Sequence, residues 1–299
     1  MSAIGHVPSA PSATVAPEEA QRRGLTGYLL MLPGTLWLLL FFIIPTVTLA
    51  ASSLYDPSGS QIDGYQMTWA FGNYPDAWAE YSGPIIRSFL YALIATVVCV
   101  LLGFPLAYAI AFKAGRWKNL MLVAVIAPFF TSFLVRTLSW KLLLGDNAWV
   151  TQTLNALPFI DGVRLLATPF AVVTGLAYNF LPFMVLPLYA SLEKIDPRLL
   201  EAGNDLYASP FTTFRLVTLP LAMPGLVAGT LLTFIPACGD FINDTLLGST
   251  NTRMVGNSIQ SLFNAGALPA ASALSVSLMV AIITLVFFYV RRAGTDDLL

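Results

Sequence analysis

Two carboxylates, Asp240 and Asp244, stand four residues apart near the end of an apolar stretch, shortly after Pro236. If the helix continues through them, this spacing places both side chains on one helical face. A carboxylate in or near a lipid bilayer is costly unless it faces water or a partner, so such a pair is a functional candidate. The alternative is that the helix has already ended and that both side chains are solvated in a loop. The first interpretation predicts an acidic site that would suit a cation.

The sequence offers little for covalent catalysis. Intramembrane serine proteolysis needs a histidine beside the serine, and the only histidine is His6, in an Ala/Pro/Ser-rich leading stretch. Aspartyl proteolysis needs two facing carboxylates, for which the Gly239-Asp240 dipeptide is only a faint match. Cys99 and Cys238 are far from a CxxC spacing, which argues against a zinc site and a disulfide framework. We therefore expect no enzyme activity, no metal and no cofactor.

ATP hydrolysis would need a separate subunit, because the chain contains no GxxxxGK[ST] phosphate-binding loop. Nucleic acid is not an expected partner either. The 15 Lys and Arg residues are balanced by 16 Asp and Glu residues, so the net charge is -1 and no basic footprint is present.

The elements that must position these residues are membrane-spanning helices. Of the 299 residues, 57% are hydrophobic and only 10% are charged, and the mean hydropathy is +0.73. These values are typical of an integral membrane protein. A bilayer core about 30 Å thick needs about 20 apolar residues in a helix. Six stretches reach that length, near residues 27–50, 88–112, 119–143, 169–190, 222–243 and 270–290.

The distribution of basic residues predicts the orientation, because Lys and Arg accumulate on the cytoplasmic side of a membrane. Two thirds of them fall before the first span, in the second and fourth connections, or after the last span, which places both termini in the cytoplasm. These residues are Arg22, Arg23, Lys113, Arg116, Lys118, Lys194, Arg198, Arg215, Arg291 and Arg292.

The predicted organisation has three parts. Residues 1–24 form a disordered cytoplasmic tail, because their composition cannot bury a core. Residues 25–293 form the six-span domain, which includes a cytoplasmic loop at 192–220, and residues 294–299 form a C-terminal cytoplasmic tail.

The cytoplasmic loop carries two helix-start signals, Asp196-Pro197 and Ser209-Pro210, in which a capping residue precedes a proline. They predict short helices over 197–206 and 210–219, the second ending at Pro220. An interfacial helix lying on lipid headgroups would show Lys and Arg on its polar face, whereas acids dominate here. The loop is therefore expected to contact another protein.

The residues of this loop resemble the EAA motif of permease subunits of bacterial ATP-binding-cassette importers. The likeness rests on Glu201-Ala202-Gly203, on Leu206 with Ala208-Ser209, and on Thr218-Leu219-Pro220 with Pro224-Gly225. The resemblance implies a coupling helix that docks in a groove of a cytoplasmic ATPase, with the glutamate paired to a basic residue there. The coupling residues that it implies are Glu201, Ala202, Gly203, Asp205, Leu206, Tyr207, Ala208 and Ser209.

Two positions depart from the motif. Gly203 stands where a second alanine is usual, and Tyr207 stands where a glycine is usual. That glycine ordinarily permits a positive φ, which tyrosine tolerates poorly. An alternative role for Tyr207 is an aromatic contact to the ATPase.

Longer segments resemble spermidine/putrescine importer permeases, although iron, thiamine and opine importers share parts of them. They begin at Pro128, Tyr178 and Leu231. The resemblance implies an all-α permease subunit in the bacterial inner membrane. Its implied partners are two ATPase copies, a second permease that is a homologue, and an extracytoplasmic binding protein. The rival is an ion-coupled secondary transporter, which would also use membrane acids but would have no use for a capped cytoplasmic loop.

A path for a polyamine should be lined by acidic and aromatic side chains. When an ammonium group leaves water, carboxylates or aromatic faces must replace the water molecules that solvated it. Asp240 would lie near the outer mouth of this path, and Asp244 would lie nearer solvent. Arg136 is an exception in such a path, and we interpret it as an interfacial or structural ion-pair residue. The candidate path residues are Asp240, Asp244, Tyr178, Phe234 and Phe241.

Overall fold

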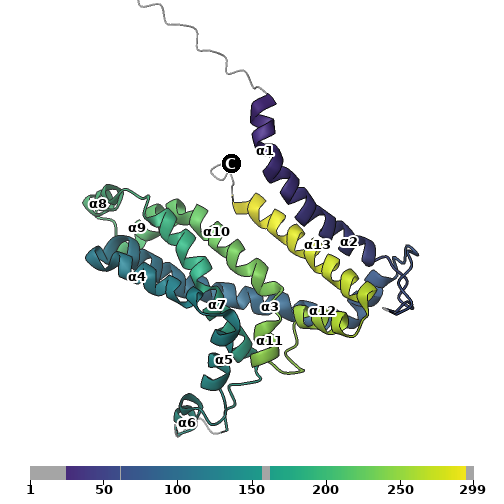
Figure 1. Cartoon of the computed structure of the whole chain (residues 1–299). Helices are drawn as coiled ribbons and strands as arrows, with labels where there is room; N and C mark the ends of the chain where they lie inside the picture. Colours follow the sequence, from purple (N-terminus) through teal and green to yellow (C-terminus); the bar gives the residue numbers. More distant parts are fainter. Residues whose placement is uncertain (1–24, 61, 157–161, 294–299) are drawn as a thin grey trace, which may run out of the picture. The chain divides into compact units, whose positions relative to one another are not determined.

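The computed structural model describes residues 25–60, 62–156 and 162–293 (Figure 1). Within these ranges the chain is helical, and the only β-type pairings are two isolated bridges, Tyr55–Met67 and Ser60–Gly64. The all-α prediction is thus confirmed. The predicted tails at 1–24 and 294–299 lie outside the described residues, and their disorder stays a prediction.

The chain divides into two units, residues 1–48 and 49–299. The described part of the first unit contains α1 (Leu25–Leu38), a π-helical turn over Leu39–Ile43 and the start of α2 (Ile44–Ser52). These elements make one apolar stretch, Leu30–Ser52, that is long enough to span a membrane. The prediction of a first span is confirmed.

The second unit is built around three long helices that pack together. They are α3 (Asn73–Tyr108), α7 (Pro169–Leu192) and α10 (Leu219–Cys238). Their shared core contains fully buried small and aliphatic residues, including Ala95, Leu176 and Met184. Close packing of α10 on α7 needs Gly225, because a Cβ there would lie 2.5 Å from the Pro187 carbonyl oxygen. Small residues at such crossings are how membrane helices approach one another.

The third span is not the single helix that we predicted over 119–143. Two helical segments, Gly115–Phe130 and Phe133–Asn155, meet at an angle of 94°. Pro128 lies in a 3-10 turn before the break, and Thr131 and Ser132 take extended backbone angles. Pro128 cannot donate the α-helical hydrogen bond to the carbonyl four residues before it, and α4 gives way to the 3-10 turn at this point. The pair comprises α4 (Lys118–Ile126), α5 (Phe133–Leu143) and α6 (Trp149–Asn155).

The fifth span also differs from the prediction. We expected a cytoplasmic helix ending at Pro220 and a separate span over 222–243, but Pro210–Cys238 is one continuous helix of 29 residues. A π-helical turn over Phe214–Thr218 joins α9 (Pro210–Thr213) to α10. Pro220 therefore does not end a helix. It lies two residues after the π-helical turn over Phe214–Thr218, and such a turn interrupts the regular α-helical hydrogen-bond pattern at the point where the proline cannot donate.

The remaining elements are shorter, apart from the last span, α13 (Leu268–Ala293). The described residues thus contain five apolar helices of spanning length, or six if the bent pair counts as one span. The predicted helix over 197–206 is confirmed to within one residue. The shorter helices are α8 (Pro197–Asp205), α11 (Ile242–Leu247) and α12 (Val255–Asn264).

Candidate functional site

Asp240 lies in the break between α10 and α11, so the two carboxylates do not share one continuous helix. Its Oδ1 accepts a hydrogen bond from the Asn243 backbone N–H at 2.7 Å, which caps the first turn of α11. The residue is only 9% exposed. Burial raises the pKa of this carboxyl to about 6, so its charge changes close to neutral pH.

Asp244 is buried as well, and both interpretations made from the sequence need correction. The helix does end before the pair, yet neither side chain is solvated, and at 4% exposure Asp244 is not nearer solvent than Asp240. Asp244 Oδ2 accepts a hydrogen bond from the Met254 backbone N–H at 2.8 Å. Burial raises the pKa of Asp244 too. The carboxylate therefore ties α11 to the start of α12.

A polar cavity of about 440 Å³ lies against Asp244. Polar groups from the end of α11, from the loop that follows it and from α12 line the cavity, and Arg253 of that loop adds one cation. The lining residues are Asp244, Thr245, Gly248, Ser249, Thr250, Arg253, Asn257, Gln260, Ser261 and Asn264.

The three aromatic candidates lie in different surroundings. Phe234 is buried in the core, with its ring 6.3 Å from that of Phe89. Phe241 is partly exposed next to Asp240, while Tyr178 packs edge-on against Trp140 and lines a separate apolar cavity of about 340 Å³. The structure brings Phe241 and the two carboxylates together, but it does not bring Tyr178 into a cavity with them.

A buried amide cluster was missed by sequence reasoning. Asn179 Nδ2 donates to Thr137 Oγ1 and to Asn243 Oδ1, each at 3.1 Å. These contacts join α7, the broken span and α11 directly beside the Asp240 cap. The signal that could have revealed the cluster is a lone asparagine, Asn179, inside an apolar span.

The loop between α8 and α10 adopts the turn that the motif's glycine would allow. Tyr207 has φ of 55°, and the Ala208 N–H donates to the Gly203 carbonyl oxygen at 3.0 Å. This is a Schellman ending, with Tyr207 at the position that usually holds glycine. Ser209 then caps α9 by accepting a hydrogen bond from the Thr212 N–H at 3.2 Å.

Gly203 departs from the usual alanine for a steric reason. A Cβ at this position would lie 2.8 Å from Thr213 Oγ1 and 3.1 Å from Thr213 Cγ2. Glycine thus lets α8 pack closely on α9, whereas alanine would force the threonine to move.

The tip of this loop is exposed and mixes apolar with acidic side chains. Leu206 is 81% exposed and Tyr207 is 97% exposed, and Phe211 follows one turn later at 72%. Glu201 and Asp205 are exposed on α8, while Ala202 is exposed and Ala208 is half-buried. Exposed apolar groups that adjoin charges are typical of a protein-binding surface.

Replacing Tyr207 by glycine should stabilise the turn. Holding a residue that has a Cβ in the left-handed backbone region costs roughly 1–2 kcal/mol of folding free energy. The glycine variant avoids this cost, but glycine loses more conformational entropy on folding, which offsets about half of the gain. We expect slower hydrogen exchange of the Ala208 amide, by a few-fold, in Tyr207→Gly. The matched control is Tyr207→Ala, which removes the ring but keeps the Cβ. An equal gain in both variants would show that the ring, and not the backbone angle, causes the strain.

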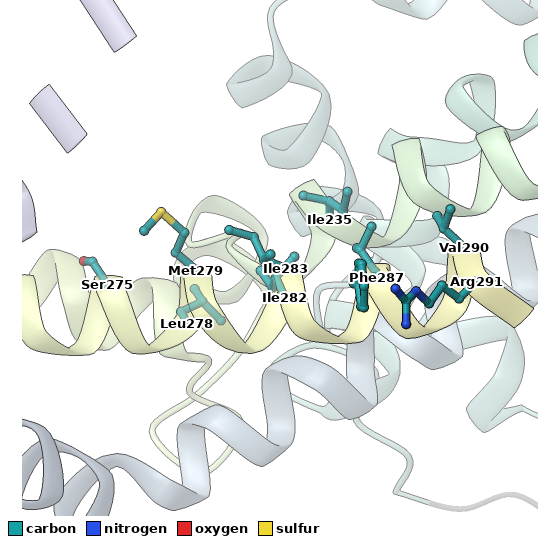
Figure 2. A pocket seen from close by; sticks show the side chains of 10 residues that line it. Ile235, Ser275, Leu278, Met279, Ile282, Ile283, Phe287, Val290 and Arg291 are labelled. Carbon is teal, nitrogen blue, oxygen red and sulfur yellow. The ribbon is translucent and has the colours of Figure 1, made fainter. Parts of the chain in front are cut away.

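An apolar groove of about 690 Å³ lies along α13, with Ile235 of α10 on its other side (Figure 2). Its lining is aliphatic and aromatic apart from Ser275 and from Arg291, whose guanidinium lies 4.3 Å from the centre of the Phe287 ring. Such a surface has no groups that would replace the hydration of a charged solute. We therefore place the candidate solute site at the carboxylates and not in this groove.

The spanning helices, the buried carboxylates at one end of Pro210–Cys238 and the exposed capped loop at its other end together define a multi-pass membrane permease. Residues 79–293 match the family described as "Binding-protein-dependent transport system inner membrane component". The chain belongs to this family, and it is accordingly a permease subunit of a bacterial inner-membrane importer.

Named relatives cover most of the chain. It is 38% identical over 258 residues to the spermidine/putrescine transport system permease protein PotB of Haemophilus influenzae, covering 85% of this chain and 90% of that protein. It is 36% identical over 260 residues to PotB of Escherichia coli strain K12, covering 86% of this chain and 94% of that protein.

A solved structure shares the fold. It is a bacterial ABC transporter involved in the import of the acidic polysaccharide alginate, with a TM-score of 0.67 and 18% sequence identity, covering 91% of this chain and 96% of the matched chain. At this identity the match supports the architecture alone.

Proposed function

We propose that this chain is a permease subunit of an ATP-driven polyamine importer and that it forms part of the path for spermidine or putrescine. The observation that carries the proposal is its identity of 36–38% to spermidine/putrescine permeases over at least 85% of its length. The buried Asp240, with a pKa near 6, supports a cationic solute, because an ionised carboxylate can replace part of the hydration of an ammonium group.

The ATPase would act from the opposite end of the same helix. Pro210–Cys238 has 29 residues and is about 43 Å long at 1.5 Å per residue. Asp240 follows one end, and the tip formed by α8, Tyr207 and Ser209 precedes the other. We infer that this tip is the coupling segment, which docks on a separate cytoplasmic ATPase present in two copies. Movement of the tip on ATP binding would then be passed along one helix toward the carboxylates.

The complete importer would also need a second permease, which we infer to be a homologue, and an extracytoplasmic binding protein that delivers the solute. Both termini of the chain would lie on the cytoplasmic side of the membrane. The permease itself would perform no covalent chemistry, since the path only has to open alternately to each side.

Uptake of labelled solutes tests the substrate assignment. Cells with and without this chain would be given labelled spermidine, putrescine, iron and thiamine. We expect the loss of the chain to reduce only the uptake of spermidine or putrescine. A loss of iron or thiamine uptake, with polyamine uptake unchanged, would agree with the importer class but contradict the assignment of a polyamine as the substrate.

The orientation has its own test at Ser209, which is exposed in the loop tip. A cysteine introduced there should react only with thiol reagents that reach the cytoplasm, either because they cross the membrane or because the cells have been broken. Cys99 and Cys238 are fully buried, so the parent chain provides an unreactive background. Labelling of Ser209→Cys in intact cells by an impermeant reagent would reverse the proposed topology.

A further inference from the structure

Tyr207 holds a backbone conformation that its side chain makes costly. Its φ is 55°, in the left-handed region that residues with a Cβ seldom adopt. The turn itself does not need tyrosine, because glycine forms the same Schellman ending without a steric cost. Close packing of Gly203 on Thr213 and the cap from Ser209 fix the turn in place. The chain therefore keeps a strained tyrosine where glycine would fold at a lower cost.

The tyrosine ring contributes almost nothing to the packing of this chain. Tyr207 lies in the turn between α8 and α9, at the edge of the second unit (Figure 1). It is 97% exposed, so hardly any of its surface is covered by the rest of the chain. The ring thus gains no burial that would offset the cost of its backbone angle. Strain that the fold does not need is typical of functional sites, so we expect another molecule to bury the ring.

Tyr207 belongs to a larger exposed apolar patch. Leu206 beside it is 81% exposed, and Phe211 in the first turn of α9 is 72% exposed. Aromatic side chains bury much surface and fix few torsion angles on binding, so they are frequent anchors in protein interfaces. The patch of Leu206, Tyr207 and Phe211 therefore suits a partner that offers an apolar surface with a pocket.

The charges around this patch favour a protein partner over a membrane surface. The charged residue nearest to Tyr207 in the sequence is Asp205, and Glu201 lies one turn earlier on α8. Both carboxylates are exposed. The cytoplasmic leaflet is negatively charged and would repel these acids if the ring entered the headgroups. A protein whose apolar pocket is bordered by basic side chains would attract them.

We propose that Tyr207 is the central anchor of the contact with the ATPase and that its ring enters an apolar pocket of that subunit, bordered by basic side chains. The inference rests on the proposed function, because it takes this loop to be the coupling segment. A buried phenol hydroxyl needs a hydrogen-bond partner, so we expect a polar group at the base of the pocket. An ATPase suited to a glycine turn would lack this pocket, so Tyr207 would restrict the permease to its own ATPase.

The test measures turn stability and ATPase affinity on the same variants, by titrating purified ATPase onto the permease complex in lipid nanodiscs. Tyr207→Gly should weaken ATPase binding by about tenfold or more, although it stabilises the turn and slows exchange of the Ala208 amide. A role in the turn alone would move both quantities in the same direction. Unchanged or tighter binding of the ATPase to Tyr207→Gly would overturn the proposal.

Two further variants separate the ring from the hydroxyl. Tyr207→Ala should weaken ATPase binding at least as much as the glycine variant, because it also lacks the ring. Tyr207→Phe keeps the ring and loses one hydrogen bond, so its affinity should fall only a few-fold. A loss in Tyr207→Phe as large as in Tyr207→Ala would contradict a ring-filled pocket.

The matched control is Trp69→Gly. Trp69 is also an exposed aromatic residue with a positive φ, of 54°, but it lies between α2 and α3, which the proposed topology places outside the cell. This change relieves the same kind of strain and removes another exposed ring, so ATPase affinity should stay at the parental value. An equal loss of affinity in Trp69→Gly would reject a specific role for Tyr207.

Oxidative footprinting distinguishes a protein pocket from a membrane contact. The full chain in lipid nanodiscs would be treated with hydroxyl radicals, with and without the ATPase, and oxidation of Tyr207 would be measured by mass spectrometry. We expect strong oxidation without the ATPase and a several-fold drop when it is added. Protection of Tyr207 before the ATPase is added would mean that the ring lies among lipid headgroups, and the proposal would be wrong.

Glu201→Ala separates failure of this inference from failure of the proposed function. If Glu201→Ala loses the ATPase and Tyr207→Gly keeps it, the loop is the coupling segment but the ring is not its anchor. If both variants bind the ATPase as tightly as the parent chain, the loop is not the coupling segment, and the inference fails with it.

Discussion

Asp240→Asn is expected to slow polyamine uptake at least several-fold while leaving the amount of assembled complex unchanged. The asparagine keeps an Oδ1 acceptor for the Asn243 N–H, and it is as good a capping residue as aspartate. The substitution therefore keeps the acceptor for the Asn243 N–H at the start of α11 and removes the charge. A hydrogen bond from an ammonium group to a carboxylate contributes about 1.5–3 kcal/mol, so its loss should be visible in initial uptake rates.

The pH dependence gives this prediction a second readout. Asp240 has a pKa of about 6, so the carboxylate is ionised at pH 7 and becomes neutral as the pH falls through 6. Parental uptake should fall over that window when the pH on the outer side is lowered, and Asp240→Asn should show no such fall. Because folding raises this pKa, the ionised form is destabilising above pH 6. The variant should thus be at least as stable as the parent chain at pH 7.

The choice of control matters here. Asp244→Asn is a poor comparison, because Asp244 uses one oxygen for the Met254 N–H while the other lies 3.4 Å from Thr252 Oγ1. An amide can replace only one of these acceptors. Asp146→Asn is better, since Asp146 is largely exposed. Normal uptake in Asp240→Asn, or a preference for an anionic solute, would remove the cation path but leave the permease assignment standing.

Glu201→Ala is expected to detach or uncouple the ATPase. Glu201 is exposed on α8 and forms no ion pair within the described residues, so its removal should cost the fold little. A charge-assisted contact to a cation of the ATPase would be worth about 1.5–3 kcal/mol, or roughly a 10- to 150-fold change in affinity. Recovery of the ATPase with the tagged permease and the uptake rate should fall together.

The matched control for Glu201 is Glu193→Gln, four residues before α8. Glu193 pairs with Lys118 at 2.6 Å on the chain's own surface. Exposed pairs of this kind contribute little, so the control should keep both ATPase recovery and transport. Unchanged recovery and unchanged transport in Glu201→Ala would refute the coupling role.

The sequence predicted best where local signals decide the structure. The Asp196-Pro197 dipeptide correctly predicted that α8 begins at Pro197, and Ser209-Pro210 correctly predicted that α9 begins at Pro210. Such predictions succeed because capping and proline geometry act over only a few residues. Hydropathy alone located the five long apolar helices, although it misplaced some of their ends.

The prediction failed where one proline is tolerated and another is not. Pro220 stays inside a continuous helix after a π-helical turn, while Pro128 precedes a 94° bend. Both are prolines in apolar surroundings, and the difference depends on the packing of neighbouring helices. The same limit applies to the candidate site. The Asn179 cluster joins residues distant in sequence, Thr137 and Asn243, and hydropathy cannot pair them. Hydropathy likewise could not show that Arg136 would be buried without an ion-pair partner among the described residues.

The central claim is that this permease moves a polyamine by using ATP hydrolysed on a separate subunit. The most direct test is spermidine accumulation in proteoliposomes that contain the purified complex, with the binding protein on one side and ATP on the other. We predict accumulation that requires both ATP and the binding protein and that persists when proton and sodium gradients are collapsed. Accumulation driven by either ion gradient in the absence of ATP would contradict the account.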